Sequence, residues 1–183
     1  MGTAYQLPVN LPKFCPYLAL LRMTEQSSSL PIGCFLRPAR SSDTWAIRKL
    51  VLSAKLDPTQ IRWSQFWVIE SEGRVVACGQ LRYFPGAQEL GSLVVAPAWR
   101  GRGLGTYLVK HLIQSATQPL YLECLGSRLA GFYTRFGFVP ISWQELPRSL
   151  KWKFGFSTLI SKILPIIAVK ILQYQGCYEH SIL

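Results

Sequence analysis

A glycine-rich turn between a strand and a helix is the part of this 183-residue sequence best suited to binding an anion. The apolar residues 93–95 predict the end of a buried strand, and Pro97 stops its pairing. From Leu104 onward, apolar side chains recur with helical spacing, so the helix begins inside the turn. Its first N–H groups have no partner within the helix, and together with the helix dipole they favour a phosphate group.

The spacing within the turn separates three kinds of phosphate loop. A dinucleotide fingerprint needs a third glycine where this chain has Thr106 or Leu108, so both registers fail. A nucleoside-triphosphatase loop ends in Gly-Lys-Ser/Thr, whereas this turn ends in Gly-Thr. The third pattern, Arg/Gln-x-x-Gly-x-Gly/Ala, is present in Arg100, Gly103 and Gly105. From the turn alone, an ordinary glycine turn with a basic rim remains the alternative.

The third pattern resembles the acetyl-coenzyme A loop of the GNAT superfamily of N-acetyltransferases. A second signature of that family, a short helix ending in Phe-Tyr-x-x-x-Gly-Phe, is similar to residues 132–138. Upstream, residues 74–84 and 87–95 flank a Pro-Gly turn and predict the hairpin that precedes a GNAT loop. The resemblance covers about residues 34–143.

The resemblance implies an α/β (α+β) fold, with a single GNAT-like domain, a mixed central sheet with splayed parallel strands, and flanking helices. It implies acetyl-CoA as co-substrate, with the pantetheine arm between the two parallel strands. A backbone N–H of the strand before the loop would also stabilise the oxyanion of the attacked thioester. The implied cofactor-binding residues are Leu93, Val94, Val95, Arg100, Gly101, Arg102, Gly103, Leu104, Gly105 and Thr106.

Three side chains are the catalytic candidates that the resemblance implies. Tyr133 matches the family tyrosine that returns a proton to the leaving thiolate. Glu123 and Glu89 are candidate bases, because an alkylammonium with a pKa of about 10 must lose a proton before it attacks. A salt bridge to an arginine is the structural alternative for each glutamate, and a packed aromatic ring is the alternative for Tyr133. The chain departs from the family at Gly126, where many members place an asparagine.

These residues predict an acetyl-CoA-dependent N-acetyltransferase that acts directly on a primary amine, in a small molecule or a peptide. The alternative is a non-catalytic acyl-CoA-binding GNAT-like module that docks to a partner or membrane through a basic segment. A net charge of +11 indicates an anionic partner, but the basic residues form no dense run, so nucleic acid is not expected. Two histidines and five cysteines show no metal-ligand spacing, so no metal is expected, and His111 is interpreted as a packed helix residue.

Periodicity and turn signals predict the elements that position these residues. We expect strands at residues 35–38, 65–70, 74–84, 87–95 and 120–125, helices at 42–52, 58–61 and from 104, and a short helix within the signature segment 130–138. Residues 138–143 and 166–172 are expected to form a terminal hairpin. Asp43 is expected to cap the first helix. Because a helix connects the strands at 87–95 and 120–125, these should be parallel.

The ends of the chain lie outside the resemblance. We expect an irregular N-terminal arm at residues 1–33, for which an organelle transit peptide is the alternative, a GNAT domain at 34–176 and a tail at 177–183. Residues 146–164 are interpreted as a basic amphipathic insertion of two helical pieces broken near Gly155. It would cover the sheet or the acceptor groove, or lie on an anionic membrane. Without a secretory signal, a cytoplasmic protein with reduced thiols is expected.

Overall fold

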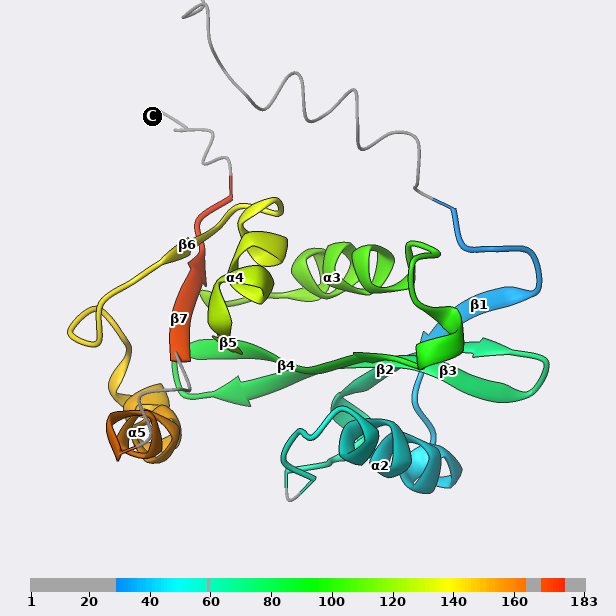
Figure 1. Ribbon diagram of the computed structural model, residues 1–183, viewed down its shortest axis with the longest axis horizontal. Coiled ribbons are helices and arrows are strands. Elements are labelled where there is room, and N and C mark those ends of the chain that lie inside the picture. The colour runs from blue at the N-terminus through cyan, green and yellow to red at the C-terminus, as the bar shows by residue number, and fades with distance from the viewer. Residues whose placement is uncertain (1–28, 59, 164–168, 177–183) are drawn as a thin grey trace, which may run out of the picture.

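Seven strands form one mixed sheet in the computed structural model, which describes residues 29–58, 60–163 and 169–176 (Figure 1). The strand order is β1-β2-β3-β4-β5-β7-β6, and every neighbouring pair is antiparallel except β4 and β5. The predicted mixed sheet is therefore confirmed. The strands are β1 (Cys34–Pro38), β2 (Phe66–Ser71), β3 (Arg74–Phe84), β4 (Ala87–Val95), β5 (Leu120–Leu125), β6 (Phe138–Pro140) and β7 (Val169–Tyr174).

Helices cover both faces of this sheet. Figure 1 shows α3 (Leu104–Ser115) and α4 (Gly126–Thr134) on one face, and α2 (Thr44–Ser53) and α5 (Arg148–Ile163) on the other. Each helix buries an apolar stripe against the strands, which is the main source of helix stability in a folded domain. The stripes are Leu108 and Leu112 on α3, Ala130 and Tyr133 on α4, Ile47 and Val51 on α2, and Leu150 and Phe154 on α5. Short 3₁₀ turns lie at Ser41–Asp43, Trp63–Gln65 and Pro97–Trp99.

Most of the predicted elements are confirmed. The hairpin strands, β5 and the start of α3 have the predicted bounds. The terminal hairpin forms between β6 and β7, although its first strand ends at Pro140 rather than at residue 143. Strand β7 is described from Val169 to Tyr174, two residues beyond the predicted end. Residues 166–168 of the predicted strand lie outside the described residues. Most of the predicted N-terminal arm, residues 1–28, and the tail at 177–183 also lie outside it.

Three predicted details are wrong. The described residues of the segment 58–61 form no helix, and the carbonyl of Gln60 instead accepts a hydrogen bond from the side chain of Gln80 at 3.0 Å. Helix α4 begins at Gly126, earlier than predicted. Helix α5 is continuous through Gly155, because Leu150 and Phe154 anchor it on the sheet and the ring of Trp143 lies over the glycine. Tertiary packing thus overrides the low helix propensity of glycine.

Asp43 occupies the cap position before α2, but its side chain does not bond to the helix. The carboxylate accepts the N–H of Arg40 at 2.7 Å and pairs with Arg37 at 2.6 Å. The hydrogen bonds from Arg37 lower the pKa of Asp43. Arg37 also pairs with Glu70 of β2 at 2.5 Å, so Asp43 ties the start of α2 to β1 and β2.

The parallel pairing of β4 and β5 is limited to two residue pairs, Gln88 with Leu120 and Glu89 with Tyr121. Gln88 holds this junction. Its backbone N–H donates to the carbonyl of Pro119 at 2.9 Å, and its side-chain oxygen accepts from the N–H groups of Thr117 and Gln118 at 2.7 and 2.8 Å. Beyond Glu89 the two strands separate, which confirms the predicted splayed parallel strands.

A β-bulge lies in β4 just beyond the last paired residues. Gly91 pairs with Gln80 and Val94 pairs with Cys78, so Ser92 and Leu93 together face Gly79 of β3. Ser92 adopts a left-handed backbone conformation with φ 48°. The bulge reverses the direction of the side chains and leaves the backbone of Ser92 and Leu93 outside the regular ladder.

The glycine-rich turn follows β4 directly. A 3₁₀ turn at Pro97–Trp99 leads into Gly101 and Gly103, whose φ angles of 76° and 80° lie in the region that favours glycine. Gly103 is the residue before α3, and Tyr107 makes the first hydrogen bond of the helix back to it at 2.9 Å. The N–H groups of residues 104–106 therefore have no partner within α3.

We predict that Gln88→Ala lowers the free energy of unfolding by about 1–3 kcal/mol, because two backbone N–H groups lose their acceptor and a buried side chain is truncated. Urea denaturation would measure the change. Gln175→Ala, at an exposed position of the described chain, is the control, and its free energy of unfolding should stay close to that of the parent protein. Equal stability of the two variants would contradict the role of Gln88.

We predict different effects of alanine at two glycines of the turn. Gly103→Ala should lower the free energy of unfolding by about 1–2 kcal/mol, because a Cβ is strained at its left-handed φ. Gly105→Ala should not destabilise the protein, because its Cβ would meet the nearest side-chain atoms at 3.6 and 4.0 Å. Thermal and urea denaturation would compare the two. A Gly103→Ala variant as stable as Gly105→Ala would contradict the prediction.

Candidate active site

The predicted cofactor-binding residues lie along the open edge of β4, the turn and the start of α3. Leu93 and Val95 pack toward α3, whereas Val94 packs toward α2. The guanidinium of Arg100 is exposed and its Nε donates to the carbonyl of Val95 at 3.1 Å, so this arginine braces the end of β4. Arg102 lies over the ring of Trp99 at 4.9 Å. The turn thus offers free backbone N–H groups next to two cations, which suits a pyrophosphate.

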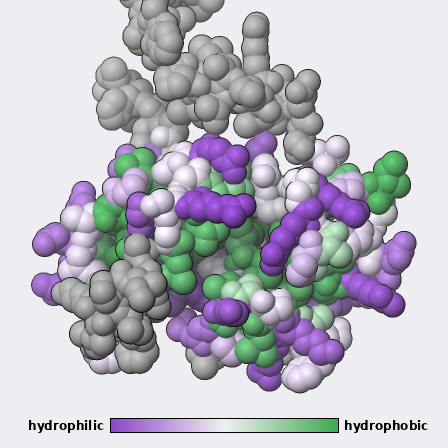
Figure 2. Space-filling view, viewed as in Figure 1, coloured by the Kyte–Doolittle hydropathy of each residue, from purple (hydrophilic) through white to green (hydrophobic). Residues whose placement is uncertain are grey.

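An open hollow of about 520 Å³ lies beside α4, lined by Arg128, Leu129, Gly131, Phe132 and Arg135. Arg135 lies over the ring of Phe132 at 5.1 Å, and the end of that ring would be 4.0 Å from a Cβ at Gly105. The hollow therefore borders the N-terminus of α3. In Figure 2, long hydrophilic side chains extend over the α3 and α4 side of the sheet. With two arginines and an aromatic ring, this hollow can bind a phosphate group and an aromatic nucleotide base.

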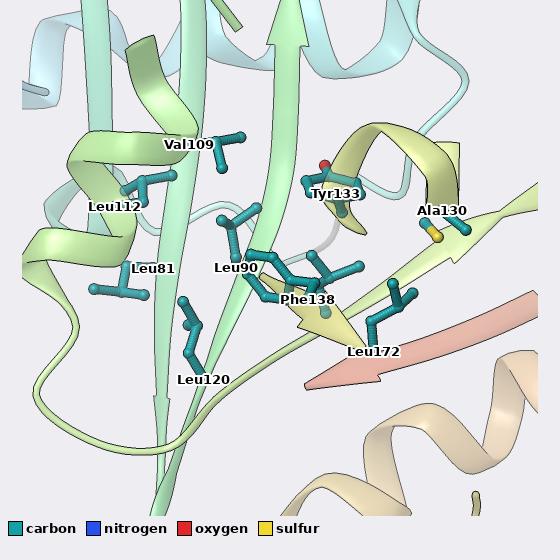
Figure 3. Packing of buried hydrophobic residues seen from close by; sticks show 11 residues of the cluster. Leu81, Leu90, Val109, Leu112, Leu120, Ala130, Tyr133, Phe138 and Leu172 are labelled. Carbon is teal, nitrogen blue, oxygen red and sulfur yellow. The ribbon is translucent and has the colours of Figure 1, made fainter. Parts of the chain in front are cut away.

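Tyr133 lies in the main apolar cluster, between α4 and the sheet, with 8% of its surface exposed. Its ring makes edge contacts with Phe132 and Phe138, with centroids 5.1 and 5.8 Å away. Figure 3 shows the hydroxyl oxygen of Tyr133 turned away from Leu120 and Leu172. Burial raises the pKa of the phenol, so Tyr133 keeps its proton at neutral pH.

Glu123 lies on β5 but on the other face of the sheet from Tyr133. Its neighbours Leu122 and Cys124 pack in the cluster of Tyr133, whereas Tyr121 packs with α5, and side chains alternate along a strand. Glu123 is half-buried and raises the pKa of Lys153 on α5 through its charge. A ligand lying between β4 and β5 would therefore have Tyr133 on one side and Glu123 on the other.

Glu89, the second candidate base, is held by two cations. One carboxylate oxygen accepts from Nη1 of Arg82 on β3 at 3.0 Å, and the other accepts from Nζ of Lys153 on α5. Glu89 is 3% exposed and is the last residue of β4 that pairs with β5. The salt bridge to an arginine, which was the structural alternative for Glu89, is therefore present. Lys153 adds a second ion pair that the sequence did not predict.

Four further polar residues of this face were not among the sequence candidates: Gln80, Arg82, Ser92 and Lys153. Nη2 of Arg82 donates to the hydroxyl of Ser92 at 2.9 Å. Among the described residues, Nε of Arg82 and Oε1 of Gln80 are buried without a hydrogen-bond partner. The sequence contains a signal for two of these residues. Gln80 and Arg82 are two positions apart, so their side chains lie on the same face of a largely apolar strand.

His111 packs against Trp67 with ring centroids 4.0 Å apart, as predicted for a packed helix residue, and burial lowers its pKa. Burial raises the pKa of Cys124 to about 11 and that of Cys78 to about 12, so these thiols stay protonated.

Across residues 29–58, 60–163 and 169–176, no cluster of three His, Cys, Asp or Glu side chains could hold a metal ion. In the same described residues, no helix combines the length and apolarity needed to cross a membrane. Cys15, Cys177 and His180 lie outside them.

Residues 62–140 match a family model described as an acetyltransferase (GNAT) domain. An amino-acid acetyltransferase of Mycobacterium tuberculosis is 31% identical over an alignment of 122 residues, and the match covers 58% of this chain and 68% of the relative. An amino-acid acetyltransferase of Shewanella oneidensis is 30% identical over an alignment of 144 residues, and the match covers 72% of this chain and 32% of the relative. The chain spans about a third or less of the Shewanella and Aliivibrio fischeri relatives that it matches.

Solved structures share the same fold. The Rv2747 protein of Mycobacterium tuberculosis, solved in complex with CoA, is 25% identical with a TM-score of 0.61, and the match covers 76% of this chain and 97% of that one. N-acetylglutamate synthase of Neisseria gonorrhoeae, complexed with coenzyme A and N-acetyl-glutamate, is 21% identical with a TM-score of 0.63, over 79% of this chain and 35% of that one. With its split parallel strands, its glycine-rich turn and these matches, the chain belongs to the GNAT family of acetyltransferases.

Proposed function

We propose that this protein transfers the acetyl group of acetyl-CoA directly to a primary amine, and that the acceptor is an amino acid. The observation that carries the proposal is the separation of β4 from β5 beside the free N-terminus of α3. It gives a thioester a place along an unpaired strand edge and its pyrophosphate a set of N–H donors. The names of the relatives support an amino-acid acceptor.

Acetyl-CoA fits the residues along this edge. The pyrophosphate would lie on the N–H groups of residues 103–106, with Arg102 at the rim and Arg128 and Arg135 in the adjoining hollow. The two arginines of the hollow offer cations in place of the family asparagine, whose position here is Gly126. The pantetheine amides would pair with the main chain of residues 93–95, where β4 has no partner in β5.

The acetyl transfer needs one base and one acid, on opposite sides of the thioester. Glu123 would take a proton from the acceptor ammonium, directly or through water, and the amine would then attack the carbonyl carbon. As the C–N bond forms and the C–S bond breaks, Tyr133 would give its proton to the sulfur. The proton that the nitrogen loses on becoming an amide would restore Tyr133. Of the two candidate bases we favour Glu123, because it is half-buried and can be reached by an acceptor, whereas Glu89 is 3% exposed between Arg82 and Lys153.

An acetyl-transfer screen of the full chain tests the proposed function. Acetyl-CoA would be mixed with amino acids, polyamines, aminoglycosides and peptide N-termini, and release of the CoA thiol would be measured. We expect release that depends on an amino acid, with the N-acetylated product identified by mass spectrometry. CoA binding without thiol release for any amine would instead support the non-catalytic acyl-CoA-binding module.

We predict that Tyr133→Phe lowers kcat by about 100-fold while CoA affinity stays within about twofold, because the variant loses only the proton donor. Thiol release and calorimetric titration of CoA would measure the two effects. Tyr83→Phe is the control, because Tyr83 is 59% exposed on β3. A Tyr133→Phe variant with unchanged kcat would show that another group protonates the thiolate.

We further predict that Glu123→Gln lowers kcat by about 100-fold at neutral pH, because the ammonium loses its proton acceptor. Glu89→Gln should instead destabilise the protein, because two buried cations lose their counter-ion. The comparison uses kcat together with thermal denaturation. A large loss of kcat in a fully stable Glu89→Gln variant would assign the base to Glu89 rather than to Glu123.

A further inference from the structure

From the ion pairs around Glu89 we infer that Arg82 and Lys153 form the binding site for the α-carboxylate of the acceptor, and that helix α5 sets the acceptor preference of this protein. The inference rests on the proposed function, since it assigns the acceptor side of the same site. Glu89 is then a fixed counter-ion that positions both cations.

Arg82 lies where the two central strands begin to separate. Its guanidinium covers the backbone of Gly91, so closely that a Cβ at Gly91 would lie 2.4 Å from Nη1. Nη1 of Arg82 donates to Glu89, the last residue of β4 that pairs with β5, and Nη2 donates to the hydroxyl of Ser92 in the bulge. An acceptor approaching the thioester from the α2 and α5 face would therefore pass this guanidinium.

Both cations keep hydrogen-bond donors for a ligand. Arg82 has five N–H donors, and 91% of its surface is buried. Its Nε is buried and has no hydrogen-bond partner among the described residues. Lys153 has three N–H donors, of which one is directed to Glu89. Each cation uses one oxygen of the same carboxylate, so a second carboxylate can bridge them.

The charges at Lys153 favour such a ligand. Burial lowers its pKa, the carboxylate of Glu89 opposes this, and the positive charge of Arg82 lowers the pKa more than Glu123 raises it. The charges of Arg82 and Lys153 therefore repel each other, and the carboxylate of Glu89, in contact with both, is shared between them. A substrate carboxylate in contact with both cations would reduce this repulsion and would replace the water that they lose on burial.

The contribution of α5 comes from the C-terminal segment of the chain. Residues 148–163 lie beyond the part that matches the family model, which ends at residue 140. Lys153 reaches the sheet because Leu150 and Phe154 on either side of it are buried against Ala87 and Tyr121. Ser149, one turn earlier on the same side of the helix, has a buried hydroxyl that lacks a partner in the described part of the chain. Figure 1 shows α5 on the face of the sheet that also carries α2.

The test compares each amino acid with its own α-carboxamide, which differs only in the charge that Arg82 and Lys153 would bind. For the parent protein we expect kcat/KM for the free acid to exceed that for the amide by about tenfold or more. Lys153→Met should raise KM for the acid and remove most of this preference, while the amide changes little. Lys153→Arg should retain the preference, because it keeps the charge. Lys151→Met is the matched control, since Nζ of Lys151 donates to the carbonyl of Gln144 instead.

Two results would overturn the inference: equal use of acid and amide by the parent protein, or equal losses for both acceptors in Lys153→Met. Calorimetric titration of the acid and the amide into the CoA-saturated protein separates this inference from the proposed function. Tighter binding of the acid without acetyl transfer would support the carboxylate site and contradict the proposed function. Transfer without discrimination between acid and amide would do the opposite, and failure of both molecules to bind would overturn the site.

Discussion

The pairing of β4 with β5 ends after two residue pairs, and the rest of the site depends on that early end. Gln88 fixes the junction through three hydrogen bonds to residues 117–119, and the bulge at Ser92 then turns β4 away from regular pairing. A buried strand edge normally has its N–H and C=O groups paired, because unpaired buried groups are costly. An edge left open inside a sheet is therefore suited to a ligand with amide groups of its own.

The two faces of the opened sheet differ in chemistry. On the side of α3 and α4, Tyr133 lies in an apolar cluster that holds its phenol in the protonated form. On the side of α2 and α5, charged and polar residues gather: Gln80, Arg82, Glu89 and Lys153. A neutral phenol and a set of charged groups are thus kept apart by one sheet, which allows each to keep its own protonation state.

Helix α5 joins apolar packing to the ion pairs of Glu89. The same turn that buries Leu150 and Phe154 carries Lys153 to Glu89, so the apolar contacts hold the ion pair in place. A long lysine side chain would otherwise lose considerable rotamer entropy on binding. Packing on both sides of Lys153 reduces that loss, and it explains why a glycine within α5 does not break the helix.

The sequence by itself determined the elements whose conformation is set locally. The Pro-Gly hairpin, the left-handed glycines before α3 and the apolar stripe from Leu104 depend on neighbouring residues, and the structure has them with the predicted bounds. Tertiary structure alone decided the partners of the charged residues. Glu89 and Lys153 are 64 residues apart, and Glu123 and Tyr133 lie on opposite faces of the sheet. Strand order and helix packing fix such contacts, and no local pattern encodes them, because each depends on elements that meet only in the folded chain.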